Sequence, residues 1–209
     1  EDGTSEFWVR IPELTATTRI LMFWGNAQPP PRAGSVWTED YSGVWQMNDV
    51  GKLILDSGRK GVHGFATSDA NGDIGVAGKA RTFADPAYAY LGGYDYSPLS
   101  GLPMTMEVWF KLPAAPGSER AVMSFHATDI TNYHYTRGAT FFVDAGGKMH
   151  FGESIQQNKW DIDLAASAVG ELNAWHHAFA SQDASGKVVF CVDGVKQGEG
   201  TFTGEWYAP

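Results

Sequence analysis

The chain has 209 residues, enough for one large domain or a domain plus a segment, and its 43% hydrophobic and 19% charged residues exclude a disordered chain. The net charge of −9 comes without a cluster of lysines and arginines, which argues against nucleic acid and anionic membrane surfaces as partners. The single cysteine, Cys191, excludes an internal disulfide, and no apolar run approaches the roughly 20 residues needed for membrane insertion.

The first 40 residues contain two β-rich runs and a connector. EFWVRIPEL (6–14) and TTRILMFWGN (17–26) are separated by a short threonine-rich turn, and each predicts a strand. AQPPPRAG (27–34) follows, and its three consecutive prolines cannot donate to a sheet, so this stretch is an extended connector. We therefore expect a domain boundary near residue 38, which separates residues 1–38 from residues 39–209.

The next segment is rich in turns. GVWQMN (43–48) predicts a strand, and residues 49–79 predict short strands that periodicity does not locate. Residues 78–93 predict two more strands, and residues 94–103 predict a loop.

The clearest strand is MTMEVWFKL (104–112), because apolar and polar side chains alternate along it. One face carries Met104, Met106, Val108, Phe110 and Leu112, and the other carries Thr105, Glu107, Trp109 and Lys111. A period of two over nine residues is typical of a half-buried strand with a defined outer face.

Further strands and turns fill the C-terminal half. Residues 120–127 alternate, residues 139–151 predict a hairpin around Gly146-Gly147, and residues 172–181 and 186–202 predict strands that turn at Asp183–Gly186 and Asp193-Gly194. Residues 164–172 have room for one helical turn. Many short antiparallel strands without a long helical stripe predict an all-β, two-sheet antiparallel β-sandwich.

Six motifs in order carry a resemblance to a known family. They are GVWQMN, LDSGRKG, GVAGKARTF, MTMEVWFKL, LNAWHHAFAS and VVFCVDG. Together they resemble the laminin-G-like, concanavalin A-like lectin/glucanase domains over about residues 41–203. One departure is Cys191, where such domains more often carry a tyrosine. FWVRIPEL and ILMFWGN resemble the C-terminal part of a bacterial domain of unknown function, DUF2341, over about residues 6–38.

The resemblance implies a jelly-roll sandwich from a larger exported bacterial protein. Such folds serve as lectins, adhesion modules and glycoside hydrolases, so the fold alone does not decide the function. Residues 1–38 hold only the tail of the DUF2341-type domain, and two strands cannot form an independent core. We expect them to pack on the sandwich of residues 39–209, or to add strands to it.

The sequence does not carry the carboxylate motif of the related glucanases, Glu-x-Asp-x-x-Glu on one strand. The strand at 104–112 offers only Glu107, whereas retaining hydrolysis needs two carboxyl groups about 5–5.5 Å apart. Asp161 and Asp163 share a strand face, but a third group is missing. The sequence therefore predicts a chain that is not an enzyme.

The histidine pair His176-His177 suggests a metal site, but its spacing argues against one. Neighbouring strand residues point to opposite faces, so the two rings cannot chelate one ion. We expect His177 to pack beside Trp175 and Phe179 on a buried face.

Two stretches are candidates for a structural calcium ion. Asp69, Asn71 and Asp73 place oxygen ligands at alternate positions, as in the first half of a calcium loop. The match is partial, because Ile74 replaces the usual glycine and Ala80 the usual glutamate, so a polar hairpin tip is the alternative. Asp56 is a second candidate, with turn capping as its alternative.

Aromatic rings beside polar side chains are the candidates for sugar binding, since rings stack on sugars and polar groups bind hydroxyls. The candidates are Tyr94, Asp95, Tyr96, Asn132, Tyr133, His134, Tyr135 and Trp160. Packing under a loop is the alternative for each. For Trp45, Trp109 and Trp175 we expect a structural role, because the family motif uses such tryptophans in its frame.

These observations predict a non-catalytic carbohydrate-binding or adhesion module at the bacterial cell surface or outside the cell. Its partners are then a glycan or cell-surface polysaccharide and other domains of the same long chain. A structural or protein-interaction spacer without glycan affinity is the alternative. A degenerate glycoside hydrolase is the reading with the least support.

Overall fold

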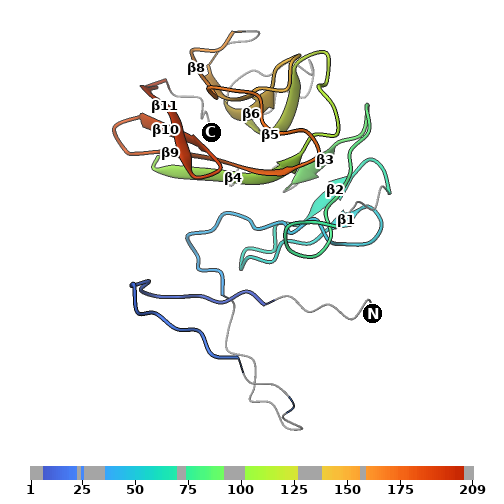
Figure 1. Ribbon diagram of the computed structural model, residues 1–209, viewed down its shortest axis with the longest axis vertical. Helices are drawn as coiled ribbons and strands as arrows, with labels where there is room; N and C mark the ends of the chain where they lie inside the picture. Colours follow the sequence, from blue (N-terminus) through green and yellow to red (C-terminus); the bar gives the residue numbers. More distant parts are fainter. Residues whose placement is uncertain are drawn as a thin grey trace. The chain divides into compact units, whose positions relative to one another are not determined.

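The computed structural model describes residues 7–22, 25, 36–69, 74–91, 102–126, 138–155 and 159–204. It divides the chain into two compact units, residues 1–93 and 94–209 (Figure 1). The boundary expected near residue 38 lies inside the first unit. All three sheets are antiparallel, and the described residues contain no helix, so the expected all-β class is confirmed.

The first unit contains a small three-stranded sheet in the order β1-β2-β3. Its strands are β1 (Leu53–Ile54), β2 (Gly64–Ala66) and β3 (Ala89–Leu91). Trp45, expected in a full strand, makes a single bridge to Asp56, and its indole N–H donates to the carbonyl of Val62 at 2.8 Å. This bond gives Trp45 the structural role that the sequence predicts.

The two strands expected near the N-terminus are absent from the described residues 7–22. Several large apolar side chains there are exposed instead, including Phe7, Leu14 and Leu21. Over these described residues the prediction was wrong, because β propensity makes a strand only where a partner strand supplies hydrogen bonds. Of the two strands expected in residues 78–93, the described residues form only β3.

The second unit is a sandwich of two four-stranded sheets (Figure 1). One sheet has the order β11-β10-β9-β4, from β4 (Met104–Lys111), β9 (Trp175–Gln182), β10 (Lys187–Val192) and β11 (Val195–Thr201). The other has the order β5-β6-β7-β8, from β5 (Arg120–His126), β6 (Gly138–Val143), β7 (Met149–Ser154) and β8 (Ile162–Ala165). The alternation expected at 104–112 and the predicted hairpins are therefore confirmed.

The core lies between the two sheets. Phe141 and Phe151 come from one sheet and Phe190 from the other, and all three are fully buried with ring centroids 5.3–6.4 Å apart. Opposite these large rings, the inner face of β9 carries Ala178 and Ala180. Small side chains face large ones, as close packing of two sheets requires.

The β10–β11 turn is formed by Asp193-Gly194, as expected. Both residues have positive φ, 51° and 74°, which is the conformation of a two-residue hairpin turn. Residues 164–172 have room for one helical turn but do not form it: β8 runs to Ala165 and an irregular loop follows. In the part of the chain that the structure describes, nothing resembles a helix able to cross a membrane.

Candidate functional site

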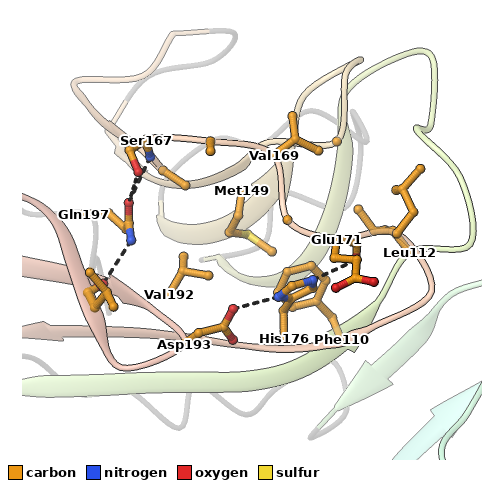
Figure 2. A pocket seen from close by; sticks show the side chains of 16 residues that line it. Phe110, Leu112, Met149, Ser167, Val169, Glu171, His176, Val192, Asp193 and Gln197 are labelled. Carbon is orange, nitrogen blue, oxygen red and sulfur yellow. Dashed lines mark hydrogen bonds and ion pairs between the residues drawn. The ribbon is translucent and has the colours of Figure 1, made fainter.

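A pocket of about 250 Å³ opens at one end of the sandwich, below the loop that follows β8 (Figure 2). Its wall is mostly apolar and comes from both sheets, with Phe110, Leu112, Met149, Val169, Leu172 and Val192. The polar side chains of its lining are Ser167, Glu171, His176, Asp193 and Gln197. The pocket therefore combines an apolar interior with a few charged groups.

His176 stands in the pocket wall with both ring nitrogens occupied (Figure 2). Its Nδ1 lies 2.7 Å from an Asp193 carboxylate oxygen, and its Nε2 lies 2.9 Å from the backbone carbonyl of Glu171. Both partners are acceptors, so both bonds form when each ring nitrogen carries a proton, which is the imidazolium form. A ring in this state has no lone pair left for a metal or for a proton from a substrate.

The charges of this pair stabilise each other. Burial lowers the pKa of His176, but the hydrogen bonds to Asp193 and to the Glu171 carbonyl outweigh it and raise the pKa above its ordinary value. Burial likewise raises the pKa of Asp193, and the bonds from His176 and from the backbone N–H of His177 bring it below its ordinary value. His176 and Asp193 therefore form an ion pair in the wall of the pocket.

His177 points to the opposite face of β9, so the expected split of the histidine pair is confirmed. Its ring stacks on Trp109 with centroids 4.9 Å apart and planes at 28°, and its Nε2 lies 3.4 Å from a Glu107 carboxylate oxygen. The other carboxylate oxygen of Asp193 accepts the backbone N–H of His177 at 2.8 Å. Asp193 therefore binds both His176 and His177, although the two rings lie on opposite faces of β9.

The face that carries His177 is the outer one, which corrects the prediction that it is buried. Trp175, His177 and Phe179 are half-buried there, whereas the buried face of β9 carries alanines. Trp109, expected to be structural, is 52% exposed on the same outer face. Lys111 lies over the Trp175 ring at 5.3 Å from its centroid. We call Glu107, Trp109, Lys111, Trp175 and His177 the outer aromatic face.

The candidate metal ligand Asp56 is buried, and backbone donors occupy its carboxylate. Its Oδ1 accepts the N–H groups of Val44 and Gly58 at 2.8 and 2.7 Å, and its Oδ2 accepts that of Val62 at 2.9 Å. Three such bonds organise the surrounding turns, which is the capping role left open by the sequence.

The other calcium candidates are only partly described. Asp69 is exposed, while Asn71 and Asp73 lie outside the described residues. Among the residues with described positions, no three histidine, cysteine or acidic side chains are grouped as a metal site would require.

Most of the candidate sugar-binding residues cannot be placed. Tyr94, Asp95, Tyr96, Asn132, Tyr133, His134 and Tyr135 lie outside the described residues. Trp160 is half-buried on the outer face of the other sheet, stacked on Phe142 with centroids 4.8 Å apart and planes at 4°. One face of its ring is therefore covered by Phe142.

Glu153 is an ionisable group in the core that the sequence did not single out. It is 0% exposed, and burial raises its pKa to about 8, so it is protonated at neutral pH. Gln182 Nε2 lies 3.3 Å from its Oε2 and 3.1 Å from the carbonyl of Phe202. The Oε1 atoms of Glu153 and Gln182 have no hydrogen-bond partner among the described residues.

The model of the concanavalin A-like lectin/glucanases superfamily matches residues 86–209, more than half of the chain. The chain belongs to this superfamily. The match covers the sandwich and begins later than the resemblance at residue 41. It does not extend to the DUF2341-like segment.

Comparison with solved structures gives a distant likeness. An S-layer domain-containing protein from Clostridium thermocellum ATCC 27405 (residues 221–444) matches with a TM-score of 0.49 and 14% identity, over 76% of this chain and 71% of that chain. A likeness this distant carries no argument about function. No curated protein matches the chain.

The outer aromatic face is not among the sugar-binding residues predicted from the sequence. The alternation in residues 104–112 correctly puts Trp109 beside Glu107, but the family resemblance predicts a structural role for this tryptophan. The pocket gives no sequence signal, because its lining comes from strands and loops far apart in the chain.

Proposed function

We propose that this chain is a non-catalytic carbohydrate-binding module and that the sugar stacks on the indole of Trp109. The supporting observation is the exposure of Trp109, 52%, on the outer face of a four-stranded sheet. The stacked His177 holds the ring from one side, so it loses little freedom on binding. An exposed, immobilised ring is suited to the apolar face of a sugar.

Polar groups beside the ring suit the hydroxyls of the same sugar. The Glu107 side chain is 60% exposed and accepts hydrogen bonds, and Lys111 on the same strand donates them. In the sheet register, Glu107 pairs with Phe179, Trp109 with His177, and Lys111 with Trp175. Acceptor, ring and donor therefore follow one another along β4.

The carboxylates on this face support binding rather than hydrolysis. The four described strands of the sheet place two on the outer face, Glu107 on β4 and Glu199 on β11. With two strands between them, they are separated by three strand spacings, about 14 Å. Glycosidases hold their two carboxyl groups about 5–9.5 Å apart, so this pair does not suit that chemistry.

The proposal extends to location and to the remaining candidates. We infer a module of a longer exported bacterial protein that acts at the cell surface on a polysaccharide, with residues 6–38 as the tail of a DUF2341-type domain. The loops around Tyr94–Tyr96 and Asn132–Tyr135 are proposed further sugar contacts. A structural Ca²⁺ near Asp69, Asn71 and Asp73 is part of the same proposal.

Affinity gel electrophoresis against a panel of soluble polysaccharides, with calcium or with EDTA, tests the proposal. We expect at least one polysaccharide to retard the protein and Trp109→Ala to abolish the retardation, because the ring on which the sugar stacks is removed. Trp8→Ala is the matched control, since Trp8 is 46% exposed in the first unit. Absence of retardation by every polysaccharide would reject the carbohydrate function.

A protein-interaction module is the second candidate, and the exposed apolar side chains of residues 7–22 favour it. Phe7, Leu14, Ile20, Leu21 and Met22 are all more than half exposed. Apolar groups at this density mark interaction surfaces. If no glycan binds and the protein associates in light scattering, with Leu21→Lys restoring a monomer, this candidate replaces the first.

A further inference from the structure

The polar side chains in the pocket wall are bonded to one another. Ser167 binds the Gln197 amide oxygen through its N–H at 2.9 Å and its hydroxyl at 3.0 Å, and the Gln197 amide group donates to the Val195 carbonyl at 3.2 Å (Figure 2). His176 uses both ring nitrogens, and Asp193 uses both carboxylate oxygens. A polar ligand entering the pocket would have to break these bonds.

The remaining lining favours an apolar ligand. Phe110, Met149, Val169 and Val192 supply apolar surface around about 250 Å³ of space. An apolar engineered cavity of about 150 Å³ stays dry and takes up benzene, so this volume is ample for one six-membered ring with a short substituent. A sugar, whose hydroxyls need partners, is not suited to it.

The charge at the pocket rim limits which substituent a bound ring can carry. The carboxylate of Glu171 is exposed at the rim, and the charges of His176 and Asp193 compensate each other. The rim therefore has a net negative charge, which repels an anionic group such as a carboxylate and favours a neutral or cationic one.

We propose that this pocket is a binding site for a compact apolar group, an aromatic ring or short alkyl chain, whose substituent is neutral or cationic. The pocket lies on the inner side of β9 and the outer aromatic face lies on the other, so one small ligand cannot occupy both. The site is therefore separate from the proposed sugar platform and does not depend on it.

Three probes with the same ring and different charges test the proposal: benzylamine, benzyl alcohol and benzoate. NMR titrations would follow the Met149 methyl group and the His176 ring in the full chain. We expect saturable shifts with benzylamine and benzyl alcohol in the millimolar range, and at least about fivefold weaker binding of benzoate. Glucose should leave both signals unchanged.

Two substitutions at one position locate the binding. Val192→Phe fills the pocket and should weaken benzylamine binding at least about tenfold, whereas Val192→Ala enlarges the pocket and should retain binding. If Val192→Phe does not fold, Glu171→Gln serves instead and should reduce the preference for benzylamine over benzoate. No saturable shift with any probe, or binding that none of these variants changes, would overturn the proposal. Retardation by polysaccharides is measured in a separate experiment. The pocket proposal and the carbohydrate function can therefore be rejected independently of each other.

Discussion

At the scale of single residues, His176 links the protonation of the sandwich to its stability. Its ring is bonded to Asp193 and to the Glu171 carbonyl, and its raised pKa means that the folded chain holds this proton more tightly than the unfolded one. The stabilisation is complete below the unfolded pKa of about 6.5 and is lost as the pH rises through the folded pKa. At the acid end, Asp193 loses its contribution as the pH falls through its lowered pKa.

His176→Gln should therefore destabilise the protein in a way that depends on pH. We expect a loss of about 2 kcal/mol in the free energy of unfolding at pH 5.5, because two charge-assisted bonds are removed, and a smaller loss at pH 9. Urea unfolding at both pH values measures it. Asp193→Asn should behave in the same way, and the double variant should cost little more than either. If His176→Gln lowered the free energy of unfolding equally at both pH values, the ion pair would be contradicted.

Glu153 gives a second pH dependence, with a different origin. Its pKa rises from 4.5 to about 8 on folding because it is buried. The folded state binds one more proton between these values, so stability is complete below about pH 4.5 and falls as the pH rises towards 8. The slope is on the order of 1 kcal/mol per pH unit.

Glu153→Gln should remove this slope. The new amide stays neutral and can donate to the Oε1 of Gln182, which has no partner among the described residues. We expect the variant to be more stable than the wild type at pH 8 and similar at pH 5, as measured by urea unfolding. Parallel curves for the two proteins would show that Glu153 is ionised or solvated in the fold.

The residue scale also shows where sequence reasoning fails. The pattern correctly put His176 and His177 on opposite faces, but the aromatic side chains were taken to mark the buried one. The inner face of β9 carries Ala178 and Ala180 instead, because the space between the sheets is already filled by Phe141, Phe151 and Phe190. Which face is inner depends on the opposite sheet, and one strand does not contain that information.

At the scale of elements, Gly152 of β7 shows how one position shapes a sheet face. Trp160 lies against it, and a Cβ at residue 152 would be 2.6 Å from the indole Cε3. The same indole stacks on Phe142 of the neighbouring strand. Glycine is needed here because a ring occupies the space above the backbone.

Gly152→Ala should displace Trp160 and destabilise the protein by about 1–3 kcal/mol. Thermal unfolding and a change in tryptophan fluorescence measure the effect. Gly198→Ala on β11 is the matched control, since its Cβ would be 3.5 Å from Leu164, an ordinary contact, and should change stability by less than about 1 kcal/mol. Equal effects of the two changes would contradict the steric role of Gly152.

The strands of the second unit could be predicted because local signals agree there. β4 has a two-residue period, and the Asp193-Gly194 turn has the residues that positive φ favours. In the first unit the local signals mislead, because apolar runs such as residues 7–14 form no strand without a partner, while β1 and β2 are too short to show a period.

At the scale of the whole molecule, the two units present different surfaces. The second unit buries a continuous core and exposes a ring on the outer aromatic face, whereas the first exposes many large apolar side chains. The family match covers the second unit, and this is where we place sugar binding.

The most direct test of the carbohydrate function is to observe the ring that is proposed to bind. An NMR titration of a retarding oligosaccharide would follow the indole N–H signals, with that of Trp109 assigned from Trp109→Phe. The Trp109 signal should shift saturably, with a smaller shift for Trp175, while those of Trp160 and Trp45 stay in place. A shift confined to Trp160, or saturable binding that leaves Trp109 unchanged, would contradict the outer aromatic face as the sugar platform.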